Sequence, residues 1–173
     1  MLIRSIQPKD YLPTRELIMN AFRHSDHGYQ NEAELVDKIR QEATYEPDLE
    51  VVAEEACQLL GHGLLSQVQI VNKDQTFTGL VLAPLAVLPE RQGQGIGGKI
   101  LQELEKRAVT HSYEFISILG HPDYYPRFGY QKASLYEITA PFPVPDAAFL
   151  IKALTPKGLA GVHGKVRYAK AFE

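Results

Sequence analysis

Hydrophobic and polar positions along the chain recur with periods that predict strands and helices in turn. Residues 2–6 (LIRSI) alternate and predict a short first strand. Asp10 is a typical helix N-cap residue, and apolar side chains at helical spacing follow it over residues 11–22. A second helix is predicted over residues 31–42, where the apolar side chains share one face. The pattern thus begins with one strand and two helices.

Three strands and a well-marked helix are predicted next. Residues 49–55 and 59–70 form the two arms of a hairpin around the short connection ACQ, and residues 76–88 form the third strand. The helix shows one apolar face, made by Ile96, Ile100, Leu101, Leu104 and Ala108. A nearly continuous apolar run at residues 114–120 predicts a buried strand. Short mixed elements follow, among them LYEIT and two predicted terminal strand segments, AAFLIKAL and GKVRYAKAF, with a glycine-rich turn between them.

This order of elements predicts the fold class. Strand pairs joined by tight turns imply local antiparallel pairing, and the steady strand–helix alternation of a doubly wound fold is missing. We therefore expect an α/β (α+β) protein with a mixed sheet. The length of 173 residues predicts one domain over 1–173, with 141–173 as a C-terminal extension packed on that domain.

Composition and charge narrow the classes of partner. A net charge of −3 argues against a general nucleic-acid binder, which is usually basic. The longest apolar run, residues 79–88, is too short to span a bilayer, so we expect no membrane partner. The single Cys57 cannot form an internal disulfide, which suits a reducing compartment. These observations predict a soluble, cytoplasmic protein.

A glycine-rich segment, PERQGQGIGGKI at residues 89–100, runs into the well-marked helix. A helix N-terminus presents unpaired N–H groups and about half a positive charge, so it attracts phosphate. Glycines let several N–H groups converge on one anion, because they adopt unusual dihedrals and carry no Cβ. The segment therefore predicts a phosphate-binding loop, with a ligand-free helix-starting turn as the alternative.

Two of the three patterns that match this loop fail. The dinucleotide pattern G-x-G-x-x-G begins at Gly93, but residues 89–91 separate the strand from it, and the next strand ends in Gly120 rather than in an acid. The Walker A pattern runs as far as Lys99, but Ile100 stands where a hydroxyl must bind magnesium.

The third pattern is Q-x-x-G-x-G, beginning at Gln92. Residues 85–97 (LAVLPERQGQGIG) resemble the signature of the GNAT superfamily of acyl-CoA N-acetyltransferases, where a strand ending V-x-P precedes this loop and a helix. Residues 119–130 (LGHPDYYPRFGY) resemble the superfamily's Y-x-(K/R)-x-G-(F/Y) element. The end, GKVRYAKAF, resembles the tail of a bacterial subgroup of uncharacterised predicted acetyltransferases. The resemblance covers nearly the whole chain and implies a GNAT-type fold, with a mixed, mostly antiparallel central sheet flanked by helices.

The resemblance implies an acetyl-CoA-dependent N-acetyltransferase. It would transfer an acetyl group to a primary amine of a small molecule or a protein, by direct attack on the thioester, as a monomer or homodimer. No metal is expected, because His24, Asp26 and His27 lack the further ligands of a zinc site and fit a solvated helix end. The alternative from another class is a non-catalytic acyl-CoA-binding or sensor module.

Site residues follow from the same resemblance. The backbone of Leu85, Ala86 and Val87 matches the positions that bind the pantetheine arm, and an N–H near Val87 would face the thioester carbonyl as a catalytic group. The pyrophosphate would be bound by the loop residues Gln92, Gly93, Gln94, Gly95, Ile96, Gly97 and Gly98. Arg91 and Lys99 are available, on electrostatic grounds, for the outer phosphates.

Proton transfer raises separate questions. Tyr125 aligns with the tyrosine that protonates the leaving thiolate in many family members, and the alternative is an aromatic pair with Tyr124 that closes the core. The general base stays open. The strand before the loop carries no acid, which leaves Glu54, Glu55 and His121 as candidates.

Overall fold

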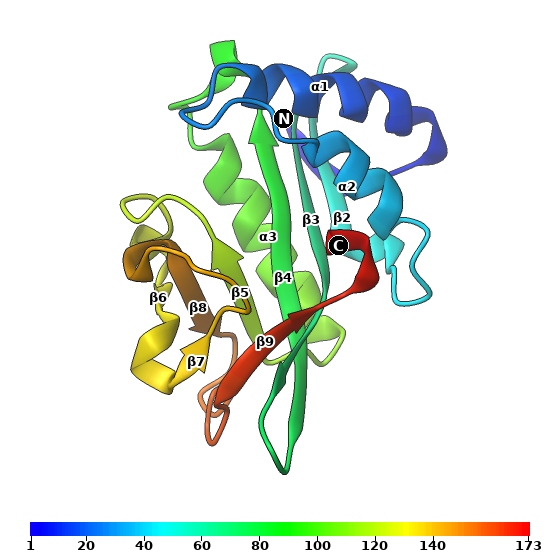
Figure 1. The fold of residues 1–173 in the computed structure, drawn as a ribbon. Coiled ribbons are helices and arrows are strands. Elements are labelled where there is room, and N and C mark those ends of the chain that lie inside the picture. Colours follow the sequence, from blue (N-terminus) through cyan, green and yellow to red (C-terminus); the bar gives the residue numbers. More distant parts are fainter. The chain divides into compact units, whose positions relative to one another are not determined.

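The computed structural model describes residues 1–173 (Figure 1). Its helices are α1 (Tyr11–Arg23), α2 (Glu32–Ile39) and α3 (Ile96–Thr110). Its strands are β1 (Leu2–Ser5), β2 (Glu50–Glu55), β3 (Gln58–Val71), β4 (Thr76–Val87), β5 (Phe115–Leu119), β6 (Gln131–Lys132), β7 (Ile138–Thr139), β8 (Phe149–Ala153) and β9 (Gly164–Tyr168). None of the helices has the length and apolar character needed to cross a membrane.

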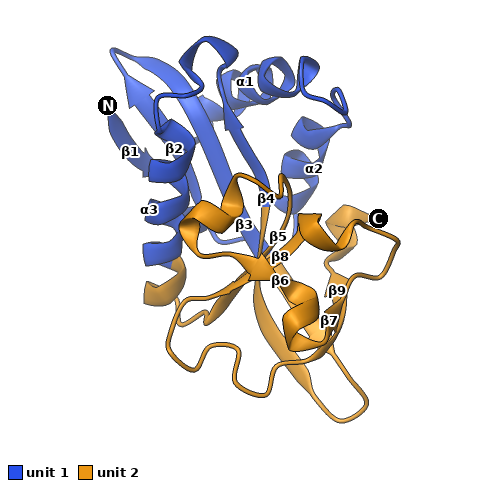
Figure 2. Ribbon diagram, turned by 90° about the vertical axis from the view of Figure 1, so that its left-hand side faces the viewer, with its two compact units in different colours: residues 1–66, 83–107 blue, residues 67–82, 108–173 orange.

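The chain forms two compact units, coloured separately in Figure 2. Unit 1 contains residues 1–66 and 83–107, and unit 2 contains residues 67–82 and 108–173. The long strands β3 and β4 each contribute residues to both units. The predicted extension, residues 141–173, belongs to unit 2, and the expectation of a single domain stays a prediction.

Unit 1 is built on antiparallel pairing of β1 with β2 and of β2 with β3. The hairpin between β2 and β3 turns at Ala56 and Cys57, both with positive φ. Helix α3 buries its predicted apolar face, since Ile100, Leu101 and Leu104 are fully buried. Burial of this face stabilises the helix far more than its intrinsic propensity does.

A buried polar cluster joins the helices of unit 1 to its strands. Glu50 of β2 is fully buried and receives hydrogen bonds from Arg40 at 2.5 and 3.1 Å and from the Tyr45 hydroxyl at 2.6 Å. The Nε2 atom of His62 on β3 lies 2.8 Å from the same carboxylate. The Arg40 guanidinium also lies over the ring of Tyr11, 4.1 Å from its centroid. Buried charges are tolerated only with such partners.

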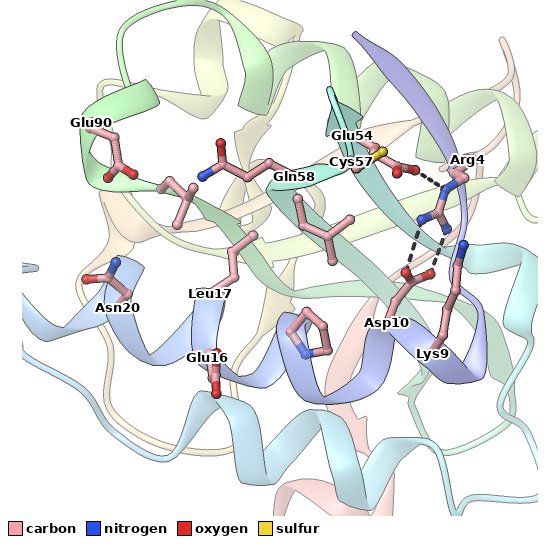
Figure 3. A pocket seen from close by; sticks show the side chains of 13 residues that line it. Arg4, Lys9, Asp10, Glu16, Leu17, Asn20, Glu54, Cys57, Gln58 and Glu90 are labelled. Carbon is pink, nitrogen blue, oxygen red and sulfur yellow. Dashed lines mark hydrogen bonds and ion pairs between the residues drawn. The ribbon is translucent and has the colours of Figure 1, made fainter.

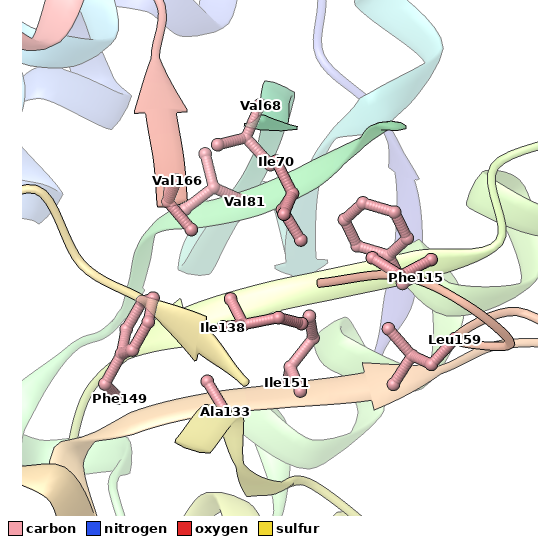
Figure 4. Close-up of a cluster of buried hydrophobic side chains, with 11 residues drawn as sticks. Val68, Ile70, Val81, Phe115, Ala133, Ile138, Phe149, Ile151, Leu159 and Val166 are labelled. Atoms are coloured by element: carbon pink, nitrogen blue, oxygen red, sulfur yellow. The ribbon is translucent and has the colours of Figure 1, made fainter. Parts of the chain in front are cut away.

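Unit 2 combines one parallel strand pair with several antiparallel pairs. β5 pairs with β4 in parallel at Leu80 and Val81, and it pairs with β8 in the antiparallel sense. β8 also pairs with β6, and β9 pairs with the end of β3 and with β7. Figure 4 shows the apolar cluster between these strands, in which Ile70, Phe115 and Ile151 are buried. The predicted mixed, mostly antiparallel α/β class is confirmed.

Two local predictions need correction. Asp10 occupies the N-cap position of α1, but its side chain does not cap the helix, because it accepts hydrogen bonds from Arg4 and from the Gln7 N–H. The last predicted strand, GKVRYAKAF, stops at Tyr168, because a 3-10 turn follows at Lys170–Phe172. The segment LYEIT, to which the sequence pattern assigns no element, contains the end of a 3-10 turn at Ala133–Tyr136 and the short strand β7.

Candidate functional site

The glycine-rich loop lies in unit 1 between β4 and α3. A 3-10 turn at Pro89–Arg91 leads into it, and α3 begins at Ile96. Gly93 and Gly95 have φ of +75° and +79°, a region that side chains with a Cβ rarely adopt. Nothing lies within 4 Å of a Cβ built on either glycine, so they are required for their dihedrals and not for close packing.

The N–H groups of this loop are largely without partners in the chain. Those of Arg91 and Gln92 donate to Leu88 and Pro89, and the helical pattern resumes where the Lys99 N–H donates to the Gly95 carbonyl at 3.1 Å. The N–H groups between these points, from residue 93 to residue 98, include the first turn of α3, whose donors have no intrahelical acceptor. Together with the positive end of the helix they form a site suited to an anion.

Side-chain hydrogen bonds hold the loop in this shape. The Gln92 side-chain amide donates to the Val87 carbonyl at 3.1 Å and ties the loop to the end of β4. The Arg91 guanidinium donates to Glu55 at 2.8 Å and to the Gln94 side-chain oxygen at 3.2 Å. Arg91 is thus engaged within the chain and braces the loop against the β2–β3 hairpin, whereas Lys99 is exposed. The sequence had suggested Arg91 only as a phosphate ligand.

The end of β4 offers hydrogen-bonding groups to a ligand. The N–H of Leu88 donates to the Leu60 carbonyl on β3 at 3.0 Å. Hydrogen-bonding groups of successive residues in a strand point to opposite sides. The N–H groups of Leu85 and Val87 therefore point away from β3, while the backbone of Ala86 faces β3, its carbonyl oxygen lying 3.1 Å from a Cβ built on Gly61. The parallel register with β5 covers only Leu80 and Val81 and ends before these residues.

Comparisons with known proteins identify this arrangement. The model of the acetyltransferase (GNAT) domain matches residues 47–132. The chain is 30% identical to Uncharacterized N-acetyltransferase YjhQ of Escherichia coli K12, over 92% of this chain and 87% of that protein. It is also 30% identical to Uncharacterized N-acetyltransferase YhbS of the same strain, over 99% and 98%. The chain belongs to the GNAT family of acetyltransferases.

Solved structures agree with this GNAT assignment. The crystal structure of YhbS from Escherichia coli in complex with CoA has a TM-score of 0.87 and 29% identity, covering 99% of this chain and 91% of that one. A GNAT family acetyltransferase from Brucella melitensis in complex with acetyl-CoA has a TM-score of 0.79 and 32% identity, covering 99% and 97%. The GNAT fold and the N-acetyltransferase class predicted from the sequence are confirmed.

The candidate acid of this GNAT protein, Tyr125, begins a 3-10 turn in unit 2. Its ring packs edge-on against Tyr124, with centroids 5.0 Å apart, and contacts Tyr130 at 6.0 Å. A Cβ added at Gly120 would lie 2.4 Å from the Tyr125 ring, so the glycine before this turn is needed for the ring's position. The Tyr125 hydroxyl forms no hydrogen bond within the chain. Burial, and to a lesser extent Tyr124, raises its pKa well above the ordinary 10.

The candidate bases are less free than the sequence implied. Arg4 donates to the Glu54 carboxylate at 2.6 Å, and Arg91 donates to Glu55. The hydrogen bond from Arg91 also lowers the pKa of Glu55. Glu55 is therefore a weaker proton acceptor, since the cation stabilises its ionised form. His121 is exposed in unit 2. None of these residues is singled out as the base.

The remaining polar side chains raise two questions, whether any could hold a metal ion and which of the loop contacts the sequence could have indicated. The structure contains no group of three or more His, Cys, Asp or Glu side chains arranged to hold a metal ion. The contact between Glu55 and Arg91 escaped sequence reasoning, because the two residues are 36 positions apart and meet only where the end of β4 lies beside the β2–β3 hairpin. The role of the Gln92 side chain had a signal in the sequence, namely the first letter of the Q-x-x-G-x-G pattern.

Proposed function

We propose that this GNAT protein transfers an acetyl group from acetyl-CoA to a primary amine, by direct attack of the amine on the thioester. One observation carries the proposal. Unpaired N–H groups of a loop with two left-handed glycines stand at the N-terminus of α3, next to outward-pointing N–H groups at the end of β4. The complexes of YhbS with CoA and of the Brucella protein with acetyl-CoA support the choice of ligand.

The residues of unit 1 fit the parts of this cosubstrate. Acetyl-CoA supplies the activated acetyl group as a thioester. Gln92 to Gly98 would bind the pyrophosphate through backbone N–H groups, and Lys99 adds positive charge at the loop. Of the three residues Leu85, Ala86 and Val87, Leu85 and Val87 would bind the pantetheine arm through their backbone groups, because those of Ala86 face β3. The Val87 N–H would donate to the thioester carbonyl oxygen, where negative charge develops.

Tyr125 is proposed as the proton donor to the leaving thiolate. Its raised pKa keeps the phenol protonated throughout the physiological range, as a general acid must be before it reacts. Its hydroxyl has no competing acceptor in the chain. We assign no general base, and we expect the rate to rise with pH as the acceptor amine loses its proton. The acceptor class, a small-molecule amine or a protein amino group, stays a prediction, as do the monomeric or dimeric state and the cytoplasmic location.

Titration calorimetry tests the ligand first. The purified protein is titrated with acetyl-CoA, and with NAD and ATP as controls for the two rejected loop patterns. We expect saturable binding of acetyl-CoA and none of the controls. Preferential binding of NAD or ATP would show that the loop was assigned to the wrong phosphate ligand.

Tyr125→Phe then tests the catalytic role, with Tyr124→Phe as the matched control. Both variants remove one hydroxyl from the same aromatic pair. Release of free CoA is followed with a panel of primary amines. For Tyr125→Phe we expect a loss of about 10²-fold in kcat, the lower end for a general acid, with unchanged affinity for acetyl-CoA. Full turnover of Tyr125→Phe across pH 6–10 would remove the acid role. Binding by the wild type without release from any amine would instead favour the non-catalytic module.

A further inference from the structure

A cavity in unit 1 lies beside the start of the glycine-rich segment. It encloses about 600 Å³ between helix α1, the β2–β3 hairpin and the segment that follows β4 (Figure 3). No residue from 92 to 98 lines it, and the proposed function leaves it without a role. Its volume is within the range of small-molecule sites, which is about 300–1,000 Å³.

The middle of this cavity is apolar. Leu17 of α1 and Leu88 after β4 line it and are 4% and 8% exposed, and Leu59 of β3 lies with them. Gln58, which is exposed, contributes its side-chain amide to the same middle part of the cavity (Figure 3). The lining therefore favours a ligand with an apolar body, whose burial contributes roughly 25 cal/mol per Å² of apolar surface.

One end of the cavity carries two cations: Arg4, which hydrogen bonds hold in place, and Lys9, which is exposed. The Arg4 guanidinium is fixed between Asp10, at 2.6 and 3.0 Å, and Glu54, at 2.6 Å. The hydrogen bond from Arg4 lowers the pKa of Asp10, so this carboxylate stays ionised and paired. Lys9 lies beside them and is exposed; it forms no hydrogen bond, and its charge also helps to lower the pKa of Asp10. Its ammonium group is left to attract an anion.

The opposite end carries a free carboxylate. Glu90 lies there with the amide of Asn20, far from Lys9 along the cavity (Figure 3). Neither side chain has a hydrogen-bond partner in the chain. The neighbouring cation, Arg91, does not neutralise Glu90, because its guanidinium is directed to Glu55 and Gln94. This end is therefore suited to an ammonium group.

We infer that this cavity is a binding site for an elongated zwitterion, with an ammonium group at Glu90, a carboxylate at Lys9 and an apolar body over Leu17, Leu59 and Leu88. Short apolar peptides and ω-amino acids share this chemistry. An α-amino acid does not, because both its charges are on one carbon and cannot reach the two ends. The site is separate from the acetyl-transfer proposal, since none of the proposed pyrophosphate-binding residues, Gln92 to Gly98, lines it.

The test is calorimetric titration of the full chain in the absence of acetyl-CoA. The probes are leucyl-leucine, its N-acetyl and C-amide forms, 6-aminohexanoate and leucine. Binding of leucyl-leucine or 6-aminohexanoate is expected, and comparison of the two identifies a peptide or an ω-amino acid as the better ligand. Blocking either charged end should raise Kd at least tenfold, because a hydrogen bond to a charged group is lost.

Variants of the protein provide the second half of the test. Glu90→Gln and Lys9→Gln should each raise Kd about tenfold, which corresponds to one charged contact. Asp74→Asn and Lys73→Gln make the same charge changes at the exposed β3–β4 turn and should leave Kd unchanged. The inference is overturned if blocked and free dipeptides bind equally, or if leucine is the one probe that binds. It is also overturned if no probe binds at concentrations on the order of 10 mM. It is equally overturned if the Glu90 and Lys9 variants bind like their controls.

Discussion

Two Gly-x-Gly triplets in unit 1, Gly61–His62–Gly63 and Gly93–Gln94–Gly95, look alike in the sequence and differ in almost every structural respect. The first lies in the first half of β3 and is fully buried, and the second is exposed in the phosphate loop. A Cβ at Gly61 would lie 2.7 Å from Ile100, whereas a Cβ at Gly93 or Gly95 meets nothing within 4 Å.

The difference shows that glycine serves two separate needs here. In β3 the glycines have ordinary dihedrals and let helix α3 approach the strand, while the residue between them turns to the opposite face and joins the Glu50 cluster. In the loop the glycines supply left-handed dihedrals that direct N–H groups outward. Substitutions in the first triplet should therefore change the free energy of unfolding, and those in the second should change ligand affinity.

The largest loss of stability is expected in the buried cluster that His62, the middle residue of the first triplet, joins. Glu50→Gln removes the charge that compensates Arg40 and contacts His62, all within the interior of unit 1. Breaking a buried ion pair by removing one partner costs about 3–5 kcal/mol. Urea unfolding should show this loss. Glu16→Gln, the same change on an exposed face of α1, should stay within about 0.5 kcal/mol of the wild type. Equal unfolding midpoints for the two variants would contradict a stabilising role of the cluster.

The same carboxylate predicts a dependence of stability on pH. Burial alone would raise the pKa of Glu50, but hydrogen bonds from His62 and Arg40 outweigh it and lower the pKa from 4.5 to about 2. A lowered folded-state pKa stabilises the fold above the unfolded pKa, so the contribution, roughly 3 kcal/mol, is lost as pH falls from about 4.5 to 2.

Urea midpoints measured between pH 7 and pH 2.5 would check this dependence. The gap in unfolding free energy between wild type and Glu50→Gln should narrow as the pH falls below about 4.5. A gap that stays constant down to pH 2.5 would mean that the cluster stabilises unit 1 without the charge of Glu50.

The close approach of α3 to β3 predicts a smaller loss. In Gly61→Ala the new methyl group would lie 2.7 Å from the Ile100 Cδ1 atom and 3.1 Å from the Ala86 carbonyl oxygen. Overpacking of this kind costs about 1–3 kcal/mol. Ile100→Val removes the Cδ1 atom and costs about 0.5–1.5 kcal/mol alone. In urea unfolding the double variant should lose less than the sum of the two single losses, and strict additivity would show that this contact is not the source of the cost.

The sequence predicted what is periodic or local. The apolar face of α3, the β2–β3 hairpin and the glycine loop each depend on residues close together in the chain, so pattern and turn chemistry were enough to place them. The Glu50 cluster was missed because Arg40, Tyr45 and His62 lie on separate segments, and only the folded chain brings them around Glu50. Asp10 was misjudged for another reason. Its side chain has the choice of two nearby partners, and the Arg4 guanidinium, six residues earlier on β1, binds it in place of the first turn of α1.

The smallest loss of stability is expected for a change in the phosphate loop, where it should be accompanied by a loss of ligand affinity. Gly95→Ala places a Cβ at φ of +79°, and Gly28→Ala does so at +68° in the connection between α1 and α2, also with nothing within 4 Å. Each should cost about 1–2 kcal/mol, the penalty of the left-handed region for an L-residue.

Only Gly95→Ala should weaken acetyl-CoA binding. The cost of the left-handed backbone at residue 95 also disfavours the loop conformation that binds the ligand. Calorimetric titration is therefore expected to show a loss of roughly tenfold in affinity, equivalent to about 1.4 kcal/mol. Gly28→Ala should bind like the wild type, because it has the same backbone penalty at a position remote in sequence from the loop. Equal losses in both variants would show that affinity follows global stability, and the contrast between the two kinds of glycine would then fail for the loop.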